Sequence, residues 1–211
     1  GSTMFLSPNE QVSVENLLKG IVTLSGNDAS VVLAECIAGT EQAFTDQMNA
    51  LAHKLGMNGS HFGTSNGWPD EGRTYVTAKD LATLAKATVQ HHEKLYKKFY
   101  GQTSFSWGQT MGGNAITQDN RNPILGHVRG ADGLKTGFVC ASGFNIVGSA
   151  VRDGRRLIAV AFGFRRADLR DEFIIRLLDE AYALKTGGNR PKVWQLRNGQ
   201  GGPATVLDQS E

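Results

Sequence analysis

Residues 144–162 read FNIVGSAVRDGRRLIAVAF, in which two β-branched and aromatic runs flank the dipeptide Asp153-Gly154. An Asp-Gly pair between two such runs is a strong hairpin signal, because both residues tolerate the positive φ of a tight turn. Phe138, shortly before the hairpin, is expected on a third strand. The sequence therefore predicts an antiparallel sheet in the second half of the chain.

Helical spacing of apolar residues lies on both sides of this sheet. The predicted helices cover residues 14–22, 28–38, 40–55, 81–91 and 168–185. Ser13 and residues 77–80 supply capping sequences typical of helix starts. Residues 56–75 are rich in turn dipeptides and predict a loop, which Trp68 is expected to pin down. The order of helices, sheet and final helix indicates an α+β fold: a helical subdomain plus an antiparallel sheet flanked by helices.

Length and composition exclude several function classes. The chain has 211 residues, 40% of them hydrophobic, which fits one domain with a short appendage. Its 22 basic and 20 acidic residues leave a net charge of +2, so we expect no nucleic-acid binding. It contains no run of about 18 apolar residues that could span a membrane. Residues 187–211 are glycine-rich and polar, and we expect them to form a flexible tail.

The cysteines and histidines show no metal-binding pattern. Cys36 and Cys140 form no Cys-x-x-Cys pair, and the five histidines match no ligand spacing. We therefore expect no metal and no cofactor, and we expect both cysteines to be buried free thiols.

Residues 132–138, Asp-Gly-Leu-Lys-Thr-Gly-Phe, place a cation, a hydroxyl and a bare backbone in succession at a predicted strand. Lys135 would supply charge to a bound carboxylate and Thr136 a hydrogen-bond donor, while Gly137 would let a peptide lie against the strand edge. The same tripeptide recurs at residues 185–187, where Lys before Gly-Gly at a helix end is ordinary C-capping.

Ser25-Gly26-Asn27 interrupts two helical segments. From that position a hydroxyl and an amide can project together into a cleft. The alternative is that Ser25 and Asn27 only cap the next helix. The pattern alone does not separate these interpretations, because Ser7-Pro8-Asn9 has the same spacing.

Five stretches, taken in order, carry a resemblance to a known family. They are residues 13–18, 25–30, 77–81, 120–123 and 132–137. Together they closely resemble the D-alanyl-D-alanine carboxypeptidases, the low-molecular-mass penicillin-binding proteins, over about residues 4–185. The resemblance implies a β-lactamase/transpeptidase-like fold, with residues 1–186 as the transpeptidase-like domain.

One motif of that family is missing. Its nucleophile lies in a Ser-x-x-Lys motif upstream of Ser-x-Asn, and no serine of this chain has a lysine three positions later. Because the resemblance begins abruptly at residue 4, we expect the domain to be N-terminally truncated and the isolated chain to be inactive. These 211 residues also contain no counterpart of the β-rich C-terminal domain that many family members carry.

The resemblance implies acyl-enzyme chemistry at the terminal D-Ala-D-Ala of peptidoglycan stem peptides, together with binding of β-lactam antibiotics. Ser25 would relay a proton toward the leaving D-alanine, and Lys135 would keep this proton path ready for transfer. Asn27 would hydrogen-bond the substrate amide. Thr136 would bind the terminal carboxylate, and the backbone N–H of Phe138 would be one oxyanion donor.

Two arginines can be carried over from the family. Arg170 lies 170 − 135 = 35 positions beyond Lys135. It either binds the substrate carboxylate or forms a helix-surface salt bridge with Asp171. Arg121, within Asn-Arg-Asn, is expected to be mainly structural.

The family also implies an exported protein, in the periplasm or on the outer face of the membrane, although membrane anchoring is not visible in the chain. Two alternatives stay open. One is a non-catalytic relative that holds stem peptides through Lys135, Thr136 and Arg170. The other is a β-lactamase, which would need a Glu-x-x-x-Asn loop between Ser25 and Lys135 that the sequence does not contain.

Overall fold

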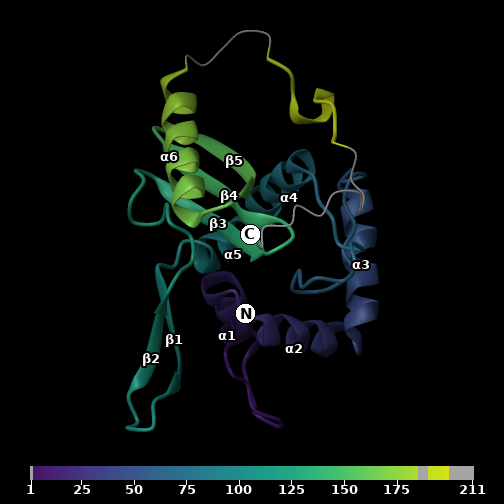
Figure 1. Cartoon of the computed structure of the whole chain (residues 1–211), viewed down its shortest axis with the longest axis vertical. Helices are drawn as coiled ribbons and strands as arrows, with labels where there is room; N and C mark the ends of the chain where they lie inside the picture. The colour runs from purple at the N-terminus through teal and green to yellow at the C-terminus, as the bar shows by residue number, and fades with distance from the viewer. Residues whose placement is uncertain (1, 185–189, 200–211) are drawn as a thin grey trace.

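The computed structural model describes residues 2–184 and 190–199 (Figure 1). Helices from the first hundred residues lie beside a three-stranded sheet from the second half, and a two-stranded hairpin extends away from both. This arrangement confirms the predicted α+β fold with an antiparallel sheet. Within the described ranges, no helix is long and apolar enough to cross a lipid bilayer.

The helical region begins with α1 (Val14–Lys19), whose cap Ser13 accepts a hydrogen bond from the backbone N–H of Asn16 at 3.2 Å. The chain continues as a π-helical turn, η1 (Gly20–Leu24). The helix predicted over residues 14–22 is therefore confirmed in place, but its second half is π-helical and extends to residue 24. The next two predicted helices are also confirmed, as α2 (Asn27–Ala38) and α3 (Glu41–Lys54).

A loop separates α3 from α4 (Ala78–His91), as predicted. Thr77 caps α4, because its Oγ1 accepts a hydrogen bond from the backbone N–H of Asp80 at 3.2 Å. A short helix that no pattern had indicated, α5 (Glu93–Phe99), follows. Trp68 is 55% exposed, so the prediction that it pins the loop is wrong.

The main sheet contains β3 (Ala131–Val139), β4 (Gly143–Arg152) and β5 (Arg155–Phe164) in that spatial order, all antiparallel. The predicted Asp153-Gly154 turn joins β4 to β5, and both of its residues have positive φ. Phe138 lies on β3 as expected.

Helices cover both faces of this sheet. On one face α6 (Ala167–Ala183) buries Ile174 completely against Ile146 and its neighbours. On the other face, Leu134 packs with residues of α4 and α5. The apolar side chains on these two faces fix the sheet against α6 on one side and against α4 and α5 on the other. Strand β3 forms one edge of that sheet.

The hairpin consists of β1 (Ser104–Gln109) and β2 (Ala115–Asp119). Phe105 and Trp107 pack against the apolar cluster under α1, whereas Met111 at the tip is fully exposed. Figure 1 shows the ribbon pointing away from the body of the molecule.

Part of the expected C-terminal tail makes defined contacts. Asn198 accepts a hydrogen bond from Thr77 Oγ1 at 2.7 Å and donates one to Asp80 Oδ1 at 3.0 Å. Lys79 donates to the carbonyl of Leu196 at 2.7 Å. The prediction of a flexible tail did not foresee this packing on α4, and the remaining tail positions lie outside the described residues.

Both cysteines are exposed and free, so the prediction of buried thiols is wrong. Cys36 lies in the last turns of the short helix α2, and Cys140 lies in the turn between β3 and β4. α2 buries Ala29, Leu33 and Ala34 and leaves Cys36 exposed, and Cys140 is exposed because it lies in a turn outside the strands.

Candidate active site

The structure brings together the two motifs found in the sequence. Lys135 Nζ donates a hydrogen bond to Ser25 Oγ at 2.8 Å and a second one to the carbonyl of Thr136 at 2.8 Å. Ser25 and Lys135 are separated by 110 positions in the chain. The N-cap of α2 is Gly26, with no side-chain capping bond, so the structure does not show the helix-capping alternative for Ser25 and Asn27.

Ser25 is held in an uncommon backbone conformation. It ends the π-helical turn η1 with φ 60° and ψ 41°, and its backbone N–H bonds the carbonyl of Gly20. Few residues other than glycine adopt this left-handed region, and such strain concentrates at functional sites. The conformation turns the hydroxyl out of the helix toward β3.

The environment of Lys135 changes its acidity. Burial of the ammonium group, together with the positive charge of Arg121, lowers the pKa of Lys135 from 10.5 to about 8. Arg121 was interpreted from the sequence as mainly structural. Its positive charge contributes to the lowered pKa of Lys135, an effect that the Asn-Arg-Asn spacing could not reveal.

Asn27 lies beside Ser25 but is engaged by the N-terminal segment. Its Nδ2 and its backbone N–H both donate to the carbonyl of Ser2, at 2.8 and 3.0 Å. Asp28 fixes the same segment by accepting hydrogen bonds from the backbone N–H groups of Met4 and Leu6. Burial alone would raise the pKa of Asp28, but these bonds hold it below its ordinary value.

The strand after Lys135 offers an open surface. Gly137 has free space around it, because a Cβ there would meet no atom within 4 Å. Phe138 is 53% exposed, and its ring centroid lies 4.3 Å from that of Phe144. In the described sheet β3 pairs with β4 alone, so its other edge, with Thr136, remains available for a further hydrogen-bonded chain.

Arg170 is buried at the start of α6 and is paired. Its Nε and Nη2 contact Asp171 Oδ1 at 2.8 and 2.6 Å, and its guanidinium lies 5.9 Å from the Phe144 ring centroid. Of the two sequence interpretations, the structure shows the ion pair. It is not a surface pair, since the Arg170 side chain is only 8% exposed.

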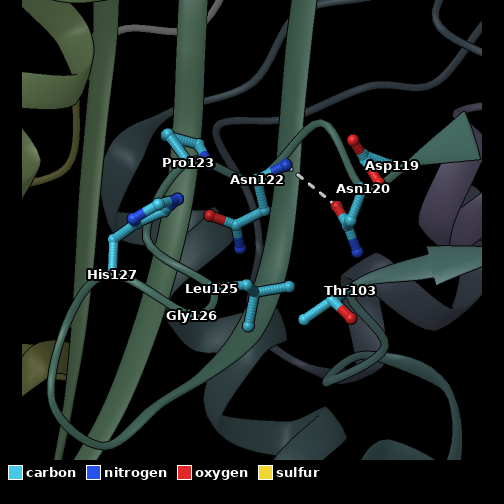
Figure 2. Close-up of a pocket in the computed structure, with 8 residues that line it drawn as sticks. All are labelled: Thr103, Asp119, Asn120, Asn122, Pro123, Leu125, Gly126 and His127. Atoms are coloured by element: carbon cyan, nitrogen blue, oxygen red, sulfur yellow. Dashed lines mark hydrogen bonds between the residues drawn. The ribbon is translucent and has the colours of Figure 1, made fainter.

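The second Lys-Thr-Gly copy, at residues 185–187, lies outside the described residues. A separate hollow of about 350 Å³ opens near the hairpin base. Figure 2 shows the residues that line it: Thr103, Asp119, Asn120, Asn122, Pro123, Leu125, Gly126 and His127. Neither Ser25 nor Lys135 contributes to this hollow, so it is distinct from the paired motifs.

Comparison with known proteins identifies similar chains. The sequence model of a family described as D-alanyl-D-alanine carboxypeptidase matches residues 1–166. The chain is 42% identical over 178 residues to D-alanyl-D-alanine carboxypeptidase DacD of Escherichia coli, covering 84% of this chain and 44% of that protein. DacF of Bacillus subtilis is 34% identical over 183 residues, 87% of this chain and 46% of that protein. The chain thus spans about half the length of the curated relatives it matches.

Solved structures show the same relationship. Carboxypeptidase DacD from Francisella tularensis superposes with a TM-score of 0.82 at 33% identity, covering 87% of this chain and 55% of that one. Penicillin-binding protein D2 from Listeria monocytogenes, in its ampicillin-bound form, has a TM-score of 0.71 at 29% identity, with coverage of 81% and 68%. The fold is therefore that of the penicillin-binding and transpeptidase proteins.

Proposed function

The chain belongs to the D-alanyl-D-alanine carboxypeptidase family, and we propose that it forms the Ser-x-Asn and Lys-Thr-Gly side of a serine-type carboxypeptidase active site. The observation that carries this proposal is the 2.8 Å hydrogen bond between Lys135 Nζ and Ser25 Oγ. It joins both motifs in one polar site beside an open strand edge. The family match over residues 1–166 supports the same reaction class.

The proposed substrate is a peptidoglycan stem peptide that ends in D-Ala-D-Ala. It would lie along β3, with its terminal carboxylate near Lys135 and Thr136 and its scissile carbonyl near the backbone N–H of Phe138. The exposed backbone at Gly137 leaves room for such a chain. Arg170 would contribute through its contact with Phe144, since its own guanidinium is engaged by Asp171.

The nucleophile must come from elsewhere, because no serine among these 211 residues starts a Ser-x-x-Lys motif. We propose that a segment outside this sequence supplies it. Its hydroxyl would lose its proton to a base outside this sequence, and its oxygen would attack the scissile carbonyl. The bond to the terminal D-alanine nitrogen would break, and Ser25 would pass a proton to that nitrogen and take one from Lys135 in turn. Water would then hydrolyse the ester and regenerate the serine.

The acidity of Lys135 suits this relay. With a pKa of about 8, its ammonium group can donate to Ser25 at neutral pH and can also release a proton at modest cost. Asn27 would bind the substrate amide in place of the carbonyl of Ser2, which now occupies its donors. β-Lactams, which also present a reactive carbonyl and a carboxylate, would be taken by the same groups.

A substrate in the cell wall places the reaction outside the cytoplasm, so we propose an exported protein acting in the periplasm or on the outer face of the membrane. The test is fluorescent-penicillin labelling of a longer polypeptide that carries the Ser-x-x-Lys segment, beside the 211-residue chain. We expect labelling of the longer polypeptide, none of the short chain, and none after Lys135→Ala. Unchanged labelling of Lys135→Ala would refute the assignment.

The missing Ser-x-x-Lys motif favours a second candidate, a protein that binds stem peptides without cutting them. It predicts that the 211-residue chain alone binds a D-Ala-D-Ala peptide in calorimetry and that no form of the protein is labelled by penicillin. The comparisons give more weight to the enzyme, because a protein similar in sequence and a protein similar in structure are each named a D-alanyl-D-alanine carboxypeptidase.

A further inference from the structure

Strand β3 contains one extra residue three positions before Lys135. Ala131 lies opposite Ala150 on β4, and Gly133 lies opposite Ser149, so Asp132 has no partner in the ladder. This is a β-bulge, a feature that redirects neighbouring side chains and is frequent beside active sites. The sequence analysis had assigned no function to Asp132.

The Asp132 carboxylate accepts hydrogen bonds from two side chains on other elements. Tyr96 Oη on α5 donates to Oδ1 at 2.8 Å. Arg156 Nη1 on β5 contacts Oδ1 at 2.9 Å and Oδ2 at 2.8 Å, and it also donates to Ser149 Oγ on β4 at 2.6 Å. The Asp132 cluster, which we define as Asp132, Tyr96, Arg156 and Ser149, therefore joins three strands and a helix.

Two members of this cluster are shielded from water, whereas the side chains of Arg156 and Asp132 are 24% and 30% exposed. Tyr96 is 1% exposed and Ser149 is fully buried. Burial raises the pKa of Tyr96, so its hydroxyl keeps its proton and remains a donor to Asp132 at ordinary pH. Tyr96 also covers the bulge directly, because a Cβ on Gly133 would lie 2.6 Å from its Oη.

Lys135 follows the bulge closely and points toward the helices. Lys135 lies opposite Val147, and Val147 packs with the cluster formed by α4 and α5. Directly opposed residues share a face, so Lys135 leaves the sheet on the side of the helices, toward Ser25. Leu134, the neighbour of Lys135, packs with the same cluster, so the regular alternation of side chains between the two faces is interrupted directly after the bulge.

We propose that Asp132 is a positioning residue: held by Tyr96 and Arg156, it fixes the bulge in β3 and thereby places Lys135 against Ser25. This inference deepens the proposed function, since the Lys135–Ser25 pair gains its meaning from that reaction. Asp132 itself need not touch the substrate. Its contribution is the geometry of the next three residues.

The test measures the titration of Lys135 by NMR in the 211-residue chain labelled with ¹³C-lysine, the signal being assigned by its loss in Lys135→Arg. Variants are Asp132→Ala and Asp132→Asn. The matched control is Asp153→Asn, which breaks an exposed Arg129–Asp153 ion pair of 3.2 Å at the turn of the same sheet. Ser25 and Arg121, the groups that act on Lys135, stay in every variant.

Positioning and direct charge effects move this titration in opposite directions. The wild-type midpoint is expected at about 8. Loss of the negative charge of Asp132 alone would lower the midpoint or leave it unchanged, whereas release of Lys135 from its buried contact would raise it toward the value of an ordinary lysine. We expect both Asp132 variants to raise the midpoint by about one pH unit or more, and Asp153→Asn to leave it unchanged.

An unchanged or lowered midpoint in a folded Asp132 variant would overturn the proposal. If Asp132→Ala does not fold, Asp132→Asn keeps the shape of the side chain and carries the test with the same criterion. Penicillin labelling of the longer polypeptide reports separately on the proposed function. A raised midpoint without any labelling of the wild type would therefore reject the enzyme and keep the positioning role.

Discussion

Replacing Lys135 by methionine should stabilise the folded chain at neutral pH. A pKa lowered from 10.5 to about 8 corresponds to about 3 kcal/mol of destabilisation at about 1.4 kcal/mol per pH unit. This is an upper limit, because part of the side chain remains accessible to solvent. Loss of the hydrogen bonds to Ser25 Oγ and the Thr136 carbonyl would cost about 1 kcal/mol each. We therefore expect a net gain of at most about 1 kcal/mol in the free energy of unfolding at pH 7.

The pH dependence makes this prediction stricter. Between pH 8 and 10.5 folded Lys135 has lost a proton that the unfolded chain still binds, so the wild-type free energy of unfolding must rise with pH. The rise from pH 7 to 9.5 is at most about 2 kcal/mol, and it should be missing in Lys135→Met. Urea unfolding at pH 7, 8 and 9.5 measures both effects, with exposed Lys94→Met as the matched control. A variant that loses 1 kcal/mol or more at pH 7, or pH curves that run parallel, would refute the reasoning.

Three further predictions concern the fold. Cys36 and Cys140 are exposed, so a thiol reagent should modify both in the native chain; modification only after unfolding would contradict their placement. Ile174 is fully buried under the sheet, so Ile174→Ala should lower the free energy of unfolding by about 3–4 kcal/mol in urea, and a loss below 1 kcal/mol would argue against that core. Thr77→Ala should cost about 1 kcal/mol through the α4 cap and speed hydrogen exchange in residues 190–199, whereas unchanged exchange there would show that Asn198 does not depend on Thr77.

Local signals predicted most of the fold. The Asp153-Gly154 turn and its flanking runs identified β4 and β5, and the Ser13 and Thr77 caps marked where α1 and α4 begin. These features depend on neighbours in the chain, so the sequence contains them directly. The π-helical turn η1 was not predictable, because its apolar spacing over five residues is that of any helix.

Features set by tertiary packing escaped the sequence analysis. Trp68 has the size of a core residue but is 55% exposed in its loop. Residues 190–199 read as a tail, yet one amide, Asn198, matches the donors and acceptors at the start of α4. Such matches join positions more than a hundred residues apart, which no local pattern reports.

The candidate site shows the same division. Lys135 and Ser25 could be singled out because their motifs have a fixed spacing, and the structure pairs them. The effect of Arg121 on the pKa of Lys135 and the ion pair between Arg156 and Asp132 could not be predicted, because both depend on how distant loops and strands meet. The sequence likewise could not show whether Arg170 pairs with Asp171 or is free to bind substrate, and the structure shows the ion pair with Asp171.

The projecting hairpin has a practical consequence. Phe105 and Trp107 anchor its base, while Met111 at its tip is fully exposed. An isolated two-stranded ribbon is only marginally stable, so it can open from the tip without the rest of the molecule unfolding. Exposed loop tips of this kind also tolerate inserted sequence. The turn around Met111 is therefore the place to insert a fluorophore tag or a protease site, where it can report on the protein without disturbing Lys135 and Ser25.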